Sequence, residues 1–394
     1  MNKNVLKIIE KKESAFYLFD IAELKKRIVY LKNKLPDKIS LCYAVKANPF
    51  VVKELIGSVD SFEICSPGEA NICRKLGVPS DQMIISGVYK SPSVIENIVS
   101  DLAFNGILTV ESVSQYSMIK NLSEKYKKNI PVLLRLTNES QFGMQRSDID
   151  SVLGEKTGSY DPALIGIQFF SGTQKNSIKK IRRELSCLDE FMKSFSDKTG
   201  RYLPRLEYGP GFPVTYFRDE EWSESDFLDS FSDCVNSLEF KGDIVLELGR
   251  SISASCGKYF TNAVDTKTTN GQEYVITDGG MHHCVYFGQH MAMKLPFVSV
   301  VGKENDSNLK KQTICGSLCS MNDILAKQIP LPEIQTGDTL CFENAGAYCM
   351  TEGISLFLSR DIPAVYLLHE NGELRCVREA IPTEYFNLPK YERS

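Results

Sequence analysis

The chain has 394 residues, 42% of them hydrophobic, which is enough for more than one hydrophobic core, so we expect two domains. Its formal net charge is -4 and its Lys and Arg are dispersed, which excludes the basic surface that nucleic acid or anionic lipid requires. No run approaches the ~18 apolar residues of a membrane span, and the charged N-terminus has no apolar signal core. These features predict a cytoplasmic protein with a small-molecule partner.

The cysteines and histidines do not indicate disulfides or a metal site. Twelve cysteines are scattered through apolar segments of a long chain without a secretion signal, which indicates reduced, mostly buried thiols. Cys315 and Cys319 lie too far apart for a C-x-x-C site, and the chain has only four histidines. We therefore expect no metal.

Strand-like runs alternate with amphipathic segments along the first part of the chain. Eight such runs occur at residues 40–45, 61–65, 83–86, 106–110, 131–136, 164–169, 206–208 and 244–246. Between them lie charged segments such as residues 177–198, whose apolar side chains recur at helical spacing. Repeated strand–helix units of this kind predict an α/β fold with a (β/α)8 TIM barrel.

After Arg250 the pattern changes to strand-like stretches broken by Gly, Asn and Asp. They include residues 273–277, 339–342 and 364–368. Residues 15–19 also look like a strand, and they could pair with this later region. We predict a barrel over residues 25–258 and a mainly β domain made of residues 1–24 and 259–394.

The first predicted barrel strand ends in a lysine. Residues 43–49 read YAVKANP, in which Lys46 has apolar neighbours. The active site of a TIM barrel forms at the C-terminal ends of its strands, and partial desolvation lowers the pKa of an amine and suits it to Schiff-base chemistry. Taken alone, Lys46 is better explained as a solvated lysine at a strand end.

The ends of two other predicted strands favour a catalytic role for Lys46. The seventh strand is followed by GPGFP at residues 209–213, a turn whose backbone N–H groups could bind phosphate, although such turns also serve backbone geometry alone. The eighth strand ends in ELGR, which places Glu247 and Arg250 at the barrel mouth, as part of a site or as a structural ion pair.

These segments belong to a series of motifs that resembles the fold-type III decarboxylases dependent on pyridoxal 5'-phosphate (PLP). That family contains diaminopimelate, ornithine and carboxynorspermidine decarboxylases and, more distantly, alanine racemase. The motifs in chain order are YAVKANP, FEICSPGEA, GVYKS, QFG, GTQ, GPGFP, ELGR, CGSLC and AGAY. They cover most of the chain, and several motifs in one order are more specific than any one. The resemblance implies a PLP-dependent amino-acid decarboxylase.

The resemblance also implies roles for the matching residues. Lys46 would hold PLP as a Schiff base, and Glu247 would keep the pyridine nitrogen protonated. Loss of CO2 leaves a carbanion at Cα whose electrons a cationic ring absorbs, and Cys319 would return a proton to that carbon. The other expected cofactor ligands are Phe170, stacked on the ring, and, around the phosphate, Thr173, Gly209, Gly211, Phe212, Arg250 and Tyr348.

In this family the cysteine loop enters the active site of the partner subunit. The resemblance therefore implies a homodimer with shared sites, in which the second domain completes the active site and the dimer interface. A buried, small apolar residue is the alternative for Cys319, but its place within CGSLC, followed by Asp323, favours a catalytic role.

Three departures from the family pattern limit the substrate. Phe170 stands where the family usually has a histidine on the cofactor ring. Ser320 stands where diaminopimelate decarboxylases have a glutamate for the distal amine, and Tyr286 where they have an arginine for the distal carboxylate. Meso-diaminopimelate would then bring charged distal groups into a pocket without charged partners. We expect Tyr286, Ser320 and Asp323 to bind a different substrate.

Nearby polar residues could add to this recognition. His282, His283 and Gln289 are candidates, and the alternative is that they are ordinary surface or interface residues. The substrate stays open among a basic diamino acid, a modified amino acid of a specialised pathway such as siderophore or antibiotic synthesis, and an amino acid carried on a larger scaffold.

Other members of the same fold class define the alternative functions. A racemase needs bases on both faces of Cα and, in alanine racemase, an arginine near the pyridine nitrogen, so Glu247 disfavours it. A non-catalytic PLP carrier of this fold is a barrel alone, whereas this chain continues well past Arg250. A regulatory homologue would be expected to lose Lys46 or the phosphate turn, and both are present.

Overall fold

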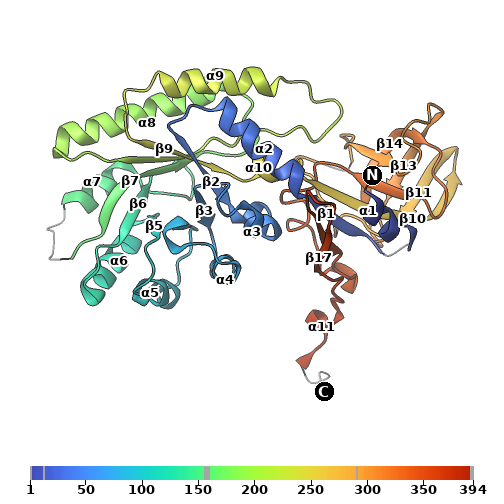
Figure 1. The fold of residues 1–394 in the computed structure, drawn as a ribbon, viewed down its shortest axis with the longest axis horizontal. Coiled ribbons are helices and arrows are strands. Elements are labelled where there is room, and N and C mark those ends of the chain that lie inside the picture. Colours follow the sequence, from blue (N-terminus) through green and yellow to red (C-terminus); the bar gives the residue numbers. More distant parts are fainter. Residues whose placement is uncertain (1, 12–13, 155–159, 290–291, 391–394) are drawn as a thin grey trace. The chain divides into compact units, whose positions relative to one another are not determined.

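The computed structural model describes residues 2–11, 14–154, 160–289 and 292–390, and the chain divides into two compact units (Figure 1). The barrel unit comprises Ile28–Pro213 and Ser223–Ile252. The sheet unit comprises Met1–Arg27, Val214–Trp222 and Ser253–Ser394. The fold class is therefore the predicted one, an α/β barrel accompanied by a mainly β unit.

The barrel unit is built on a closed ring of parallel strands. In ring order these are β2 (Ile39–Ala44), β3 (Ser61–Ile64), β4 (Met83–Ile85), β5 (Ile107–Val110), β6 (Pro131–Arg135), β7 (Ala163–Phe170), β8 (Arg205–Gly209) and β9 (Asp243–Leu248). The ring closes where Ile39 of β2 pairs with Ile244 of β9. The predicted TIM barrel is confirmed, and each predicted strand corresponds to one of these.

A helix follows each barrel strand. They are α3 (Val52–Leu55), α4 (Pro67–Leu76), α5 (Pro92–Ser100), α6 (Val113–Tyr126), α7 (Arg146–Gly154), α8 (Ile178–Thr199), α9 (Glu224–Asn236) and α10 (Arg250–Ser253). Short 3-10 turns add η1 (Val45–Ala47), η2 (Pro49–Val51) and η3 (Ser80–Gln82). Helix α8 has the end signals that make a helix predictable from sequence. Ser177 caps its first turn, and Gly200 ends it in the left-handed region at φ 66°.

Apolar side chains from neighbouring strands fill the interior of the barrel. The buried cluster consists of Cys42, Ile84, Ile107, Leu133 and Val245. Burial of this apolar surface holds the ring together at one level. Polar side chains lie further along these strands, near their C-terminal ends. That is where the active site of a TIM barrel forms.

The sheet unit is one nine-stranded sheet. Its strands are β1 (Phe16–Asp20), β10 (Gly257–Thr269), β11 (Gln272–Thr277), β12 (Val298–Val300), β13 (Leu309–Cys315), β14 (Ile324–Pro332), β15 (Thr339–Phe342), β16 (Ala364–Leu368) and β17 (Leu374–Arg378). The main order is β14-β13-β11-β10-β1-β16-β17, and β15 pairs with both β10 and β12. Helices α1 (Lys3–Glu10) and α11 (Glu384–Asn387) and the turn η4 (Phe357–Ser359) accompany it, and α2 (Ile21–Lys34) leads from β1 into the barrel unit.

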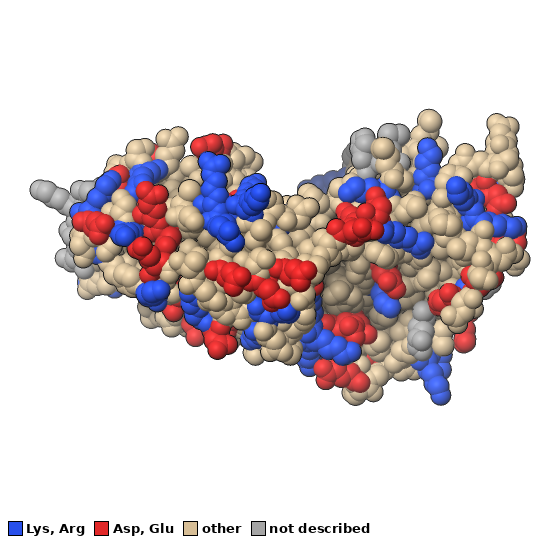
Figure 2. Space-filling model, turned by 90° about the horizontal axis from the view of Figure 1, so that it is seen from above, with Lys and Arg blue, Asp and Glu red and all other residues tan. Residues whose placement is uncertain are grey.

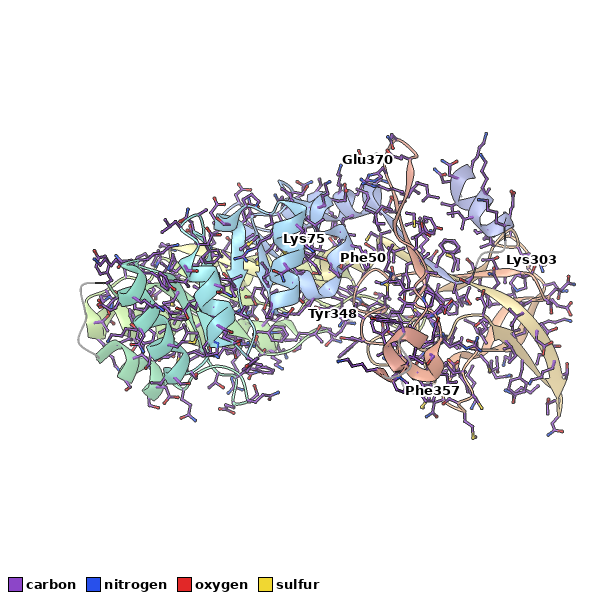
Figure 3. The ribbon with its side chains drawn as sticks, turned by 90° about the horizontal axis from the view of Figure 1, so that it is seen from below. Phe50, Lys75, Lys303, Tyr348, Phe357 and Glu370 are labelled. Atoms are coloured by element: carbon purple, nitrogen blue, oxygen red, sulfur yellow. The ribbon has the colours of Figure 1, made fainter. Side chains whose placement is uncertain are left out.

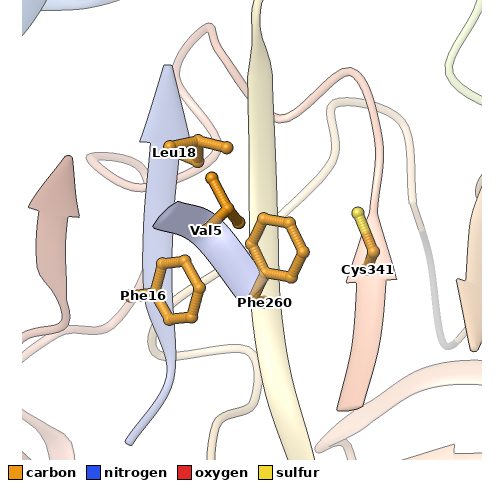
Figure 4. Close-up of a cluster of buried hydrophobic side chains, with 5 residues drawn as sticks. All are labelled: Val5, Phe16, Leu18, Phe260 and Cys341. Carbon is orange, nitrogen blue, oxygen red and sulfur yellow. The ribbon is translucent and has the colours of Figure 1, made fainter. Parts of the chain in front are cut away.

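The N-terminal strand β1 lies inside this sheet, as its sequence predicts. It pairs antiparallel with β10 and parallel with β16. Phe16 stacks on Phe260 of β10 at a ring-centroid distance of 4.7 Å, and Val5 of α1, Leu18 and Cys341 complete the buried cluster (Figure 4). This packing ties the first residues of the chain to the C-terminal sheet.

The molecular surface carries mixed charge. Acidic and basic side chains lie next to one another over the face drawn in Figure 2. In the sheet unit, Glu370 lies at the tip of the hairpin that joins β16 and β17 (Figure 3). Among the described residues, no helix is both long and apolar enough to cross a membrane.

Candidate active site

Lys46 lies in η1, directly after strand β2 of the barrel. Its Nζ donates to Glu63 Oε2 at 2.7 Å and lies 3.3 Å from Cys65 Sγ. The Lys46 side chain is 42% exposed, whereas that of Glu63 is 7% exposed. The amine is thus held by a buried carboxylate while remaining accessible at the strand end.

The groups around Lys46 have shifted pKa values. Burial alone would raise the pKa of Glu63, but the charge of Lys46 and the hydrogen bonds from Lys46 and Cys65 hold that pKa below its usual value. Burial and the negative charge of Glu63 raise the pKa of the Cys65 thiol, so Cys65 stays protonated beside the lysine. Glu63 is the counter-ion that orients Lys46.

Glu247 lies near the end of β9, one ring position from β2, where it pairs in register with Cys42. Gln168 of β7 donates its side-chain N–H to Glu247 Oε1, and it also lies 3.4 Å from Ser86 Oγ. Burial, followed by the charges of Glu63 and Glu207, raises the pKa of Glu247 well above its usual value. Glu247 therefore holds a proton more tightly than an ordinary carboxyl group does.

The glycine turn after β8 packs tightly against the loop after β7. A Cβ on Gly209 would lie 2.5 Å from Phe170 Cδ2, and a Cβ on Gly211 would overlap the carbonyl oxygen of Gly172. Gly211 also has φ 61°, in the left-handed region. Both positions thus require glycine, and the turn forms a narrow cradle of backbone groups.

Thr173 and Arg250 meet beside this cradle. Arg250, 6% exposed at the start of α10, has its Nε 3.4 Å from Thr173 Oγ1. The ring of Phe212 is buried and packs edge-on against Phe227 and Phe231 of α9, so only its backbone could face a ligand. The barrel thus brings together a hydroxyl, a guanidinium and backbone N–H groups, which suit a phosphate.

Further charges lie at other strand ends of the barrel. Arg135 of β6 donates to Glu111 Oε1 at 2.8 Å, and these side chains are 11% and 2% exposed. Lys90, in the loop after β4, donates to the carbonyl of Gly87 at 2.6 Å. Burial lowers the pKa of Lys90 to about 8. These charged groups make the C-terminal end of the barrel polar, whereas the interior of the barrel is mostly apolar.

Cys319 lies in an exposed loop of the sheet unit, between β13 and β14. Asp323 anchors this loop from the inside, because its carboxylate accepts from the backbone N–H of Met281 at 2.7 Å and of Leu318 at 2.8 Å. Met321 at the loop tip is 93% exposed. Asp323 thus shapes the loop that carries Cys319, and we do not include it among the residues that would touch the substrate.

The other two expected substrate residues differ in their surroundings. Ser320 lies in the same loop, where its hydroxyl accepts from the backbone N–H of Asn322 at 3.3 Å. Tyr286 is 5% exposed, and its hydroxyl donates to the carbonyl of Glu343 at 2.6 Å. Its ring lies 5.4 Å from that of Tyr216, so Tyr286 is part of a buried aromatic cluster, and we leave it out of the proposed site.

Tyr348 follows β15 in a loop packed on the start of β10. The N–H of Gly346 donates to the carbonyl of Ala254 at 3.0 Å, and a Cβ on Gly257 would overlap Gly346. Tyr348 itself, labelled in Figure 3, comes from this loop. It is half-buried and has φ 64°. A residue other than glycine in the left-handed backbone region carries strain that the surrounding contacts must compensate. Such strain is common at binding sites.

The other candidate recognition residues are structural or buried. His283 contacts the hydroxyl of Tyr259 at 3.2 Å and the carbonyl of Asp361 at 2.7 Å, and Gln289 Nε2 donates to the carbonyl of Lys294 at 2.8 Å. His282 is 1% exposed and packs 3.8 Å from the His283 ring. Neither of its ring nitrogens has a hydrogen-bond partner among the residues described.

The two histidines should make the sheet unit acid-sensitive. Burial lowers the pKa of His282 to about 3 and that of His283 to about 4, so the folded protein keeps both neutral while the unfolded chain takes up protons below its ordinary value near 6.5. The free energy of unfolding must then fall as the pH falls below about 6.5.

The His282→Phe variant tests this pH dependence. Between pH 6.5 and 5, wild type should lose about 2 kcal/mol more of its unfolding free energy than the variant, at about 1.4 kcal/mol per pH unit for one histidine. Urea unfolding at a series of pH values measures the difference. Parallel pH profiles for the two proteins would contradict the buried, neutral state of His282.

Comparison with known families decides what this barrel is. A family model described as "Pyridoxal-dependent decarboxylase, C-terminal sheet domain" matches residues 16–346, which is most of the chain. The chain belongs to the pyridoxal-dependent decarboxylases. Its activity is accordingly the PLP-dependent decarboxylation of an amino acid, and the family resemblance of its motifs is confirmed.

Two relatives of this decarboxylase act on amino acids that are part of larger molecules. L-glutamyl-[BtrI acyl-carrier protein] decarboxylase of Niallia circulans is 26% identical over 392 residues, covering 93% of this chain and 91% of that protein. The 2-[(L-alanin-3-ylcarbamoyl)methyl]-2-hydroxybutanedioate decarboxylase of Staphylococcus aureus is 26% identical over 390 residues, covering 91% and 94%.

A solved structure shares the fold. Diaminopimelate decarboxylase from Helicobacter pylori, complexed with L-lysine, superposes with a TM-score of 0.82 at 23% identity. The alignment covers 97% of this decarboxylase and 98% of that chain. At this identity the likeness establishes the architecture and leaves the substrate open.

The decarboxylase barrel has the groups that a pyridoxal cofactor needs. Gln168 Oε1 is a buried oxygen without a partner among the described residues, and it lies on the side chain that contacts Glu247. The glycine cradle beside Thr173 leaves room for no side chain, and Lys46 is accessible. An amine, a buried acid and an anion cradle at the ends of one barrel fit PLP. No group of three or more metal-ligating side chains occurs in the described ranges.

Several functional residues of this decarboxylase have no role that could be assigned from the sequence motifs. Glu63 is the counter-ion of Lys46, Gln168 holds Glu247, and Arg135 pairs with Glu111. A signal was available for the strand residues: Glu63, Gln168 and Arg135 are polar side chains within otherwise apolar barrel strands, where a buried charge or amide needs a partner.

Proposed function

We propose that this decarboxylase binds PLP through Lys46 and removes CO2 from an amino acid whose side chain belongs to a larger conjugate. The observation that carries the cofactor proposal is the pairing of the accessible Lys46 with buried Glu63, whose charge helps to raise the pKa of the buried Glu247. When bound, PLP supplies an electron sink for the carbanion that loss of CO2 leaves at Cα.

The residues of the barrel would hold the cofactor in fixed roles. Arg250, Thr173 and the N–H groups of the glycine turn would bind its phosphate, and Phe170 would pack on its ring. Glu247, held by Gln168, would share its proton with the pyridine nitrogen. Glu63 would orient the Lys46 amine and balance its charge when it carries a proton.

Residues of the sheet unit would complete the site in a homodimer. In this proposal the exposed loop that Asp323 shapes reaches the barrel of a second copy, so that Cys319 of the partner subunit returns a proton to Cα. The exposure of Cys319 and Met321 supports such a contact. Tyr348 would contribute to the phosphate site. The cytoplasmic location stays a prediction from the sequence.

The proposal of a conjugated substrate has two supports. Ser320 carries no charge and Tyr286 is buried, so neither provides a charged anchor for a distal ammonium or carboxylate. In addition, the two relatives named above act on a glutamyl group on a carrier protein and on an alanine joined by an amide to a hydroxybutanedioate.

Release of CO2 over a substrate panel tests the proposal. The panel contains a glutamyl thioester, an amide of 2,3-diaminopropionate with a hydroxy-tricarboxylic acid, meso-diaminopimelate, lysine, ornithine and free glutamate. We expect kcat/KM for one conjugate to exceed that for every free amino acid by at least about 100-fold, because a site shaped for a group discriminates against molecules that lack it.

Two outcomes would contradict this assignment. Fast turnover of meso-diaminopimelate would show that the distal charges are recognised after all. Optical inversion of an amino acid without CO2 release would favour a racemase, so the same reactions are analysed by chiral chromatography.

A further inference from the structure

A buried ion pair lies directly behind the glycine cradle of the barrel. Lys175, in the loop after β7, places its Nζ 2.7 Å from Glu184 Oε2 on helix α8. The two side chains are 4% and 11% exposed. A buried pair of this kind is costly to form and contributes little stability by itself, so its position calls for another explanation.

Glu184 is the centre of a closed network of donors. Besides Lys175, it accepts from Ser171 Oγ at 2.5 Å and from Tyr208 Oη at 2.6 Å. Lys175 Nζ also donates to Ser171 Oγ at 2.9 Å. Burial acts to raise the pKa of Glu184, but the hydrogen bonds from Lys175, Ser171 and Tyr208 hold it below its usual value, so the carboxylate stays charged.

The same lysine also joins the two loops that form the cradle. Its backbone N–H donates to the carbonyl of Gly211 at 2.9 Å. Gly211 in turn packs against Gly172, and Thr173 lies between Gly172 and Lys175 along the chain. The side chain of Lys175 therefore fixes one end of the loop that carries Thr173. Its backbone N–H fixes the glycine turn against which that loop packs.

We propose that Lys175 and Glu184 are positioning residues for the cofactor phosphate: their ion pair, with Ser171 and Tyr208, holds the Thr173 loop against the glycine turn. This inference rests on the proposed binding of PLP by this barrel. Backbone N–H groups bind an anion well only when their directions are fixed beforehand, which the network provides. Lys175 also neutralises Glu184, whose unpaired charge behind the cradle would repel a phosphate.

The Lys175→Met variant tests the role of the pair. We expect its dissociation constant for PLP, measured by absorbance titration of the apoprotein, to rise at least about tenfold, as loss of an outer partner of a binding group usually does. The dissociation constant for pyridoxal, which has no phosphate, should stay within about twofold of wild type. Inorganic phosphate should raise the thermal unfolding midpoint of wild-type apoprotein more than that of the variant.

Control variants separate positioning from folding. Lys193, also on α8, pairs with Glu239 at 2.8 Å, but these side chains are 61% and 72% exposed, so Lys193→Met should bind PLP like wild type. Lys175→Arg keeps the charge and should recover part of the affinity. If Lys175→Met does not fold, Tyr208→Phe removes one donor to Glu184 and should weaken PLP binding by a smaller factor.

The outcomes distinguish this inference from the proposed function. If wild type takes up no PLP, both fail. If wild type binds PLP and Lys175→Met binds it equally tightly, only the positioning role fails. An equal loss of affinity for PLP and for pyridoxal would also overturn it, because the network would then support the fold of the barrel and not the phosphate site.

Discussion

The Lys46→Met variant is expected to lose covalently attached PLP and to lower kcat by at least about 10³-fold, within the range of 10²–10⁴ that one side chain acting on protons contributes. Lys46 is the accessible amine beside Glu63, and methionine keeps its length but offers neither a nucleophile nor a proton donor. Cofactor content after gel filtration and CO2 release at saturating PLP measure the two effects.

A matched lysine serves as control for this variant. Lys53 lies on α3, the helix that follows the same strand, and is exposed, so Lys53→Met should leave cofactor content and kcat unchanged. Retention of a covalent adduct and of full activity by Lys46→Met would show that another amine carries the cofactor.

The Glu247→Gln variant should have the second largest effect. Glutamine keeps the hydrogen-bonding shape next to Gln168 but cannot carry the negative charge that balances a protonated ring nitrogen. We expect kcat to fall about 10²-fold to 10³-fold, the usual cost of removing one group that stabilises developing charge, while Lys46 still binds the cofactor. Steady-state rates and cofactor content of the same preparation separate these effects.

The control for Glu247 comes from the same strand. Asp243 begins β9 and is exposed, so Asp243→Asn should be neutral. A Glu247→Gln enzyme with the rate of wild type would mean that the ring nitrogen needs no carboxylate here, and the electron-sink argument for decarboxylation over racemisation would lose its basis.

Much of the fold follows from local pattern in the sequence. The barrel strands are short apolar runs and the helices between them have one apolar face, so each unit is recognisable without tertiary information. The strand at Phe16–Asp20 was predictable from its run of apolar and aromatic residues. Its parallel pairing with β16 was not, since residues so far apart in sequence give no local signal of register.

The candidate site was predictable where its residues follow strands in recognisable motifs. Lys46, Thr173 and Arg250 are of this kind. The partners inside the barrel were harder: Gln168 acquires its role only because β7 brings it to Glu247. Tyr286 is a different case: a substitution at a family position suggested substrate contact, and the side chain packs in an aromatic cluster, so its contact with substrate stays a prediction.

The most direct test of this account is chemical trapping of the cofactor. The purified enzyme, loaded with PLP, is reduced with borohydride, digested and mapped by mass spectrometry. We expect one modified peptide, which contains Lys46, and no modification in the Lys46→Met variant. Attachment of the cofactor to another lysine, such as the buried Lys90, or the absence of any modified peptide would contradict it.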